Sequence, residues 1–211
     1  MSYSSLWLVN KDFIGEEGVE FGNSWLFAPI VGDVLFNKYL PEKVMSPYGK
    51  TNYITASMFD NTIVTKLNEK INNCDVQEDR ILWELTNQQI FETKNKDFIA
   101  DCIIKFLDIN KKYMTDSGEH IFDRFKEISD EIKNIDTTQA SYFIFKNTSC
   151  DDGVEYWFER YNEDKEEYEH SSLLDLDKAV AELVVIKDNK ITQFVLNTKL
   201  KDYLKSNNLI D

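Results

Sequence analysis

The side chains that most often act as bases, nucleophiles or metal ligands are scarce in this chain of 211 residues, which has two histidines and three cysteines. His120 precedes Asp123 by three positions, so on a helix the two side chains could share a metal ion or a proton. No second histidine lies nearby in the sequence, and neither HExxH nor a facial triad is present locally. The sequence therefore favours a helix-cap or surface role for His120, and His170 is no better placed for chemistry.

The three cysteines, Cys74, Cys102 and Cys150, are odd in number and widely spaced. This pattern predicts neither a disulfide framework nor a CxxC metal site. Cys102 falls within an apolar helical pattern, so we expect it in the core. Cys150 is followed by two aspartates. Because neighbouring carboxylates raise the pKa of a thiol, Cys150 is a poor candidate for a nucleophile.

The sequence also lacks the loops that commonly hold phosphate or a catalytic serine. Its seven glycines form neither GxGxxG nor GxxxxGK[ST], and no GxSxG is present. The acidic run EEYE at 166–169 could attract Ca²⁺, but it lacks the Asp/Asn-Gly geometry of an EF-hand loop. We therefore expect no cofactor and no metal ion.

The most unusual segment is VEYWFERYNEDKEEYEH, residues 154–170, which holds five aromatic and seven carboxylate side chains. Residues 151–188 contain thirteen acidic and four basic residues, a net charge of −9 out of −14 for the whole chain. Two interpretations stand side by side. The segment is either a solvated hairpin or a surface that contacts a partner.

If residues 153–161 form a strand, alternate side chains point to opposite faces. The core face would hold Val154, Tyr156 and Phe158. The other face would present Glu155, Trp157, Glu159 and Tyr161. Aromatic rings between carboxylates suit contact with a basic protein, because the rings supply buried area and the acids meet lysine or arginine. The residues that we predict to contact a partner are Glu155, Trp157, Glu159, Tyr161, Glu163, Asp164, Glu166, Glu167, Tyr168 and Glu169.

The overall composition narrows the class of partner. The chain is 42% hydrophobic, enough for a sizeable core, and its pI is near 4.6. Such acidity argues against direct contact with nucleic acid or with anionic lipid. No signal peptide is recognisable at the N-terminus, and no apolar run approaches the roughly 18 residues that span a bilayer. We expect a cytoplasmic protein with reduced thiols.

The order of the expected elements predicts an α+β fold, a mostly antiparallel sheet with a central run of amphipathic helices packed on it. Ile121, Phe125, Ile128 and Ile132 recur at helical spacing, whereas residues 80–91 fit either a helix or a strand. The predicted single domain, 1–211, comprises an N-terminal hairpin 4–29, a helical region 33–135, C-terminal strands 140–197 with a turn at Asp188-Asn189, and a terminal helix 198–206.

Together these features predict an acidic, non-enzymatic inhibitor that neutralises a basic protein, such as an immunity protein against a toxin or nuclease, or a phage anti-defence protein. Two alternatives remain open. One is a hydrolase or transferase whose site is assembled from distant residues, with loop 41–52 and the acids around His120 as its expected places. The other is a structural or phage-particle component. The oligomeric state is not predicted.

Overall fold

A six-stranded sheet with helices on both faces organises the computed structural model, which describes residues 3–41, 45–46, 49–50, 53, 57, 61–114, 118–147 and 153–209. The strands follow the spatial order β10-β9-β5-β6-β1-β2, and β5 and β9 are the parallel pair of neighbours in this otherwise antiparallel sheet. Their bounds are β1 Tyr3–Val9, β2 Gly15–Gly22, β5 Ile90–Glu92, β6 Tyr142–Lys146, β9 Glu182–Lys187 and β10 Lys190–Leu196. The predicted α+β class is confirmed, and the described residues form one compact domain.

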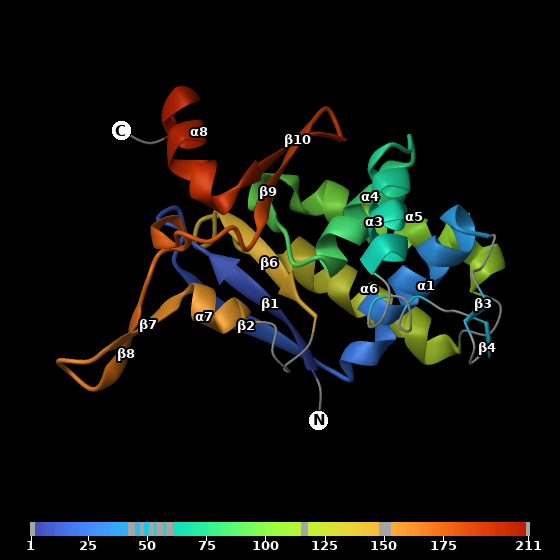
Figure 1. Ribbon diagram of the computed structural model, residues 1–211, viewed down its shortest axis with the longest axis horizontal. Helices are drawn as coiled ribbons and strands as arrows, with labels where there is room; N and C mark the ends of the chain where they lie inside the picture. The colour runs from blue at the N-terminus through green and yellow to red at the C-terminus, as the bar shows by residue number, and fades with distance from the viewer. Residues whose placement is uncertain are drawn as a thin grey trace.

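In the part of the chain that the structure describes, five helices cover one face of the sheet, which Figure 1 shows on the right. They are α1 Ala28–Tyr39, α3 Asn61–Asn72, α4 Gln77–Thr86, α5 Lys96–Asn110 and α6 Glu119–Asn134. Phe143 and Phe145 of β6 face this helical layer, where Phe145 contacts Phe27 with ring centroids 5.0 Å apart. Short 3-10 turns, η1 Ser24–Leu26, η2 Thr93–Asn95 and η3 Lys111–Tyr113, link these elements.

The opposite face of the sheet packs against a smaller layer. It consists of α7 Val154–Trp157, η4 Leu173–Asp175, η5 Asn197–Lys199 and α8 Leu200–Ser206. Tyr142 and Ile144 of β6 point to this side, alternating with Phe143 and Phe145. A strand buried on both faces reads as a continuous apolar run rather than an alternating one, and YFIF is such a run.

Several predicted boundaries are wrong. The N-terminal hairpin ends at Gly22 rather than at 29, because the residues after it enter η1 and then α1, which has a proline in its first turn. The predicted helical region 33–135 contains strand β5. The ambiguous segment 80–91 divides between α4 and β5. The terminal helix begins at Leu200, after a 3-10 turn.

Other elements agree with the sequence. Strands β9 and β10 form the predicted hairpin, and Asp188 and Asn189 at its turn both have positive φ, 49° and 57°. The predicted loop 41–52 lies largely outside the described residues, but Met45–Ser46 (β3) and Gly49–Lys50 (β4) form a small ribbon there. In the part of the chain that the structure describes, no helix has the length and apolar character needed to cross a membrane.

A buried polar cluster joins α1, α4 and α5. Asp79, with no exposed surface, accepts from Lys38 Nζ at 2.5 Å, from the Tyr39 hydroxyl at 2.5 Å and from Asn110 Nδ2 at 2.9 Å. Burial and the hydrogen bond to Asp79 raise the pKa of Tyr39, so its hydroxyl stays a donor. The three helices are therefore held in register by one carboxylate.

Removing that carboxylate leaves the Lys38 ammonium without its counter-charge. We expect Asp79→Ala to lower the free energy of unfolding by about 3–5 kcal/mol, measured by urea denaturation. Asp175→Ala is the matched control, because its 3.1 Å ion pair with Lys201 is half exposed, and we expect a loss of less than about 1 kcal/mol. Equal losses in the two variants would contradict a special role for Asp79.

Candidate protein-binding surface

The acidic segment 154–170 does not begin as a strand. Residues Val154–Trp157 form one helical turn, α7, which precedes the hairpin of β7 (Glu159–Asn162) and β8 (Glu167–His170). In a helical turn, positions three and four apart share a face. Val154, Trp157 and Phe158 accordingly point into the core, whereas Tyr156 is 64% exposed. The predicted alternation of faces is therefore wrong for both Tyr156 and Trp157.

Trp157 belongs to the smaller core layer rather than to the surface. It is 9% exposed and packs in the same cluster as Val154, while Phe158 stacks on Trp7 of β1 at 5.6 Å between ring centroids. Gly15 of β2 lies directly beneath the Phe158 ring. These contacts attach the start of the acidic segment firmly to the sheet.

Glu155 is engaged inside the molecule. Its Oε2 lies 2.9 Å from the Nζ of Lys146, whose side chain is 2% exposed and whose ammonium lies 5.5 Å from the centroid of the Tyr3 ring. Burial is the largest single effect and disfavours both charges, but hydrogen bonding and the attraction between the two charges together outweigh it, so the pKa of Lys146 is raised and that of Glu155 is lowered. The Glu155 carboxylate therefore neutralises a buried lysine at the end of β6.

The hairpin itself presents an exposed pair of tyrosines. Tyr161 and Tyr168 lie opposite each other on β7 and β8, with ring centroids 5.2 Å apart, and are 53% and 63% exposed. The other predicted residues surround this pair. Glu163, Asp164, Glu166 and Glu167 are exposed, Glu159 is half-buried, and Glu169 bonds to Lys165 at 2.5 Å.

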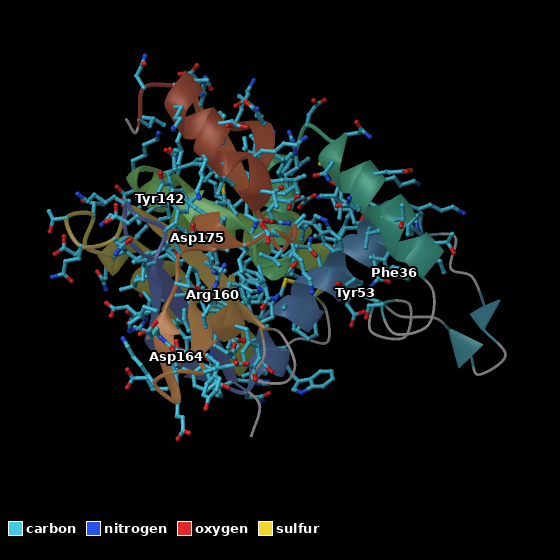
Figure 2. The ribbon with its side chains drawn as sticks, turned by 60° about the vertical axis from the view of Figure 1, so that its left-hand side comes forward. Phe36, Tyr53, Tyr142, Arg160, Asp164 and Asp175 are labelled. Atoms are coloured by element: carbon cyan, nitrogen blue, oxygen red, sulfur yellow. The ribbon has the colours of Figure 1, made fainter. Side chains whose placement is uncertain are left out.

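The base of the hairpin is fixed while its tip projects from the body of the molecule. Arg160 donates to the carbonyl of Asp175 at 2.6 Å, and the Ser171 N–H donates to the carbonyl of Phe158 at 2.8 Å. Figure 2 shows Asp164 near the tip and Arg160 nearer to Asp175. The exposed tyrosines are thus carried on an anchored support, which lowers the entropy lost when a partner binds.

Sequence reasoning missed a second group of acids beside this hairpin. Glu16, Glu17 and Glu20 are exposed on β2, the edge strand of the sheet. A hollow of about 310 Å³ separates β2 from the base of the hairpin, and its lining includes Glu16, Glu17, Glu155, Glu159 and His170. The sequence of β2, GEEGVEFG, indicates an exposed edge strand. Its polar residues do not alternate regularly with apolar ones, as they would on an interior strand.

A separate hollow of about 380 Å³ is lined by residues of α3, α4, β9 and β10 and of the link between α4 and β5. Glu84 of α4 is 3% exposed there, and burial together with the charge of Glu182 raises its pKa to about 8. Burial also raises the pKa of Glu182. No spacing in the sequence points to this pair, because the two residues come from elements far apart in the chain.

The catalytic candidates among the described residues lie on different elements, apart from His120 and Asp123, which share α6. His120 and Asp123 are exposed on α6, and His170 ends β8. Burial raises the pKa of the Cys102 thiol to about 12, while Cys150 lies outside the described residues. Within those residues, no group of three or more His, Cys, Asp or Glu side chains is arranged to hold a metal ion.

Comparisons with protein-family models, curated proteins and solved structures give no match to this chain.

The contact between Gly15 and Phe158 can be tested by adding one methyl group. A Cβ at Gly15 would lie 2.7 Å from two carbons of the buried ring, whereas a Cβ at Gly22 would meet nothing within 4 Å. We expect Gly15→Ala to destabilise the fold by about 1–3 kcal/mol. Gly22→Ala should change stability by less than about 0.5 kcal/mol in the same thermal unfolding assay.

The Glu84 carboxyl predicts how stability depends on pH. Its pKa of about 8 lies above the ordinary glutamate value of 4.5, so between these values the folded chain holds a proton that the unfolded chain has lost. Stability contributed by this group therefore falls as pH rises through that window, by on the order of 1.4 kcal/mol per pH unit. Glu84→Gln should flatten the pH dependence of the urea midpoint, whereas the exposed control Glu163→Gln should leave it unchanged. Parallel curves for wild type and Glu84→Gln would refute the assignment.

Proposed function

We propose that this chain is a cytoplasmic binding protein that neutralises a basic protein partner, as an immunity protein or an anti-defence protein does. The observation that carries the proposal is the exposed Tyr161–Tyr168 pair, set among exposed carboxylates on a hairpin with a fixed base. Paired aromatic side chains are frequent energetic centres of interfaces, and surrounding acids accelerate encounter with a basic surface.

The proposed surface differs from the one expected from sequence in two respects. Trp157 contributes to the core and Glu155 to the Lys146 ion pair, so neither is available as a primary anchor. The exposed glutamates of β2 extend the acidic surface beyond the hairpin. Its centre is therefore Tyr161 and Tyr168, with Glu163, Asp164, Glu166 and Glu167 at the tip.

The test begins with the tagged chain, expressed in its native host and recovered at low and then at raised salt. A stoichiometric basic protein that is lost as salt rises is the expected result. With that protein purified, Tyr161→Ser/Tyr168→Ser should weaken binding by at least about 2 kcal/mol, roughly thirtyfold in Kd. Calorimetric titration at fixed ionic strength measures the change.

A charge-matched pair of variants separates the hairpin from overall acidity. Glu163→Lys/Asp164→Lys should lower the association rate strongly, whereas Asp108→Lys/Asp123→Lys, on the exposed faces of α5 and α6, should have a small effect. Unchanged binding in folded hairpin variants would exclude this surface. Absence of any partner would instead favour the alternatives, an enzyme or a structural component.

A further inference from the structure

The hollow beside Glu84 is polar. Some of its polar side chains have hydrogen-bond partners, whereas others have none. The Asn68 Oδ1 accepts from Trp83 Nε1 at 2.7 Å and from Asn72 Nδ2 at 3.1 Å, and the Gln89 Oε1 accepts from the Glu182 N–H at 2.5 Å. These bonds fix the walls. Two further oxygens, Glu84 Oε1 and Asn72 Oδ1, are buried without a hydrogen-bond partner among the described residues.

Buried acceptors without donors are uncommon in folded proteins, because the loss of hydration is not compensated. Glu84 is more than nine-tenths buried and is one of the residues that line the hollow, together with the exposed Asn68 and Asn87. Among the residues that line the hollow, the two buried atoms without a partner are both oxygens, so the deficit there is of hydrogen-bond donors.

The charge of the lining agrees with this deficit. Two carboxylates, Glu84 and Glu182, and four side-chain amides line the hollow, and no lysine, arginine or histidine is among the lining residues. Phe194, which is partly exposed, adds apolar surface, and the buried Trp83 also lines the hollow. Its volume of about 380 Å³ is in the range of sites for small molecules.

From this arrangement we propose that the hollow binds a small primary alkylamine, its ammonium received by Glu84, Glu182 and Asn72 and its carbon chain packed against Trp83 and Phe194. An ammonium offers three donors and no acceptor, which matches the unpartnered oxygens. An aromatic face also attracts a cation and accommodates methylene groups.

Other ligands fit this lining less well. An anion would meet two carboxylates and no cationic side chain. A divalent metal ion prefers more carboxylates than this hollow offers, and the described residues contain no group of three or more acidic, histidine or cysteine ligands. Arg80, one turn before Glu84, is a cationic side chain whose charge acts on that carboxyl. Its charge lowers the pKa of Glu84 by less than burial and Glu182 raise it, and its Nε is itself buried without a partner.

The test is isothermal titration of the full chain with butane-1,4-diamine, with butane-1,4-diol as an uncharged ligand of similar length. We expect saturable binding of the diamine and no heat from the diol. Because Glu84 holds a proton at neutral pH, the diamine should release protons on binding, seen as different heats in phosphate and Tris buffers. Its affinity should increase about fivefold from pH 7 to pH 8 as the carboxyl ionises.

Glu84→Gln should weaken diamine binding at least tenfold and abolish the proton release. Glu163→Gln, which makes the same substitution at the hairpin tip, should bind the diamine as wild type does. Equal binding by wild type and a folded Glu84→Gln would overturn the proposal, because the amine would then be bound through the overall negative charge of the chain. Absence of binding at about 10 mM diamine would overturn it as well. This site is remote from the proposed protein-binding surface, so either proposal can fail without the other.

Discussion

Strand β6 is apolar on both faces, so the chain has to cover both sides of its sheet. Phe143 and Phe145 need the helices on one side, and Tyr142 and Ile144 need α7, α8 and their connecting turns on the other. Because α7 is held against the sheet by Phe158 on Trp7, the hairpin that follows leaves the molecule from a fixed point. Packing of the smaller layer against the sheet therefore determines where the acidic hairpin projects from the molecule (Figure 1).

Individual elements were predictable from the sequence where a helix is long or where a turn requires particular residues. Helix α6 repeats its isoleucines over four turns, and Asp188-Asn189 supplies the left-handed backbone of the β9–β10 turn. Prediction failed where elements are short. Four residues of α7 are too few to distinguish a period of 3.6 from a period of 2, so Trp157 was assigned to the wrong face. Three residues of β5 after α4 could not be separated from a longer helix.

Of the candidate surface, the sequence could predict the exposed tyrosines and the acids at the hairpin tip, since they are neighbours along the chain. It could not predict that Glu155 would neutralise Lys146, because β6 ends before the acidic segment begins and a buried lysine has no local signature. Nor could it place Glu84 beside Glu182. The pair depends on the parallel alignment of β5 with β9, which brings the C-terminal third of the chain next to α4.

Strand β1 lies between β2 and β6, and the Ser4 hydroxyl donates to the carbonyl of Asn147, a residue 143 positions later. During synthesis the first hairpin emerges long before the strand that completes its pairing. The apolar side chains of Leu6 and Trp7 therefore stay exposed to solvent until most of the helical layer has been synthesised. Such non-local pairing slows folding and lengthens the period in which a nascent chain can aggregate. The glutamates of β2 place negative charge along the other edge of this hairpin, where like charges discourage two chains from pairing edge to edge.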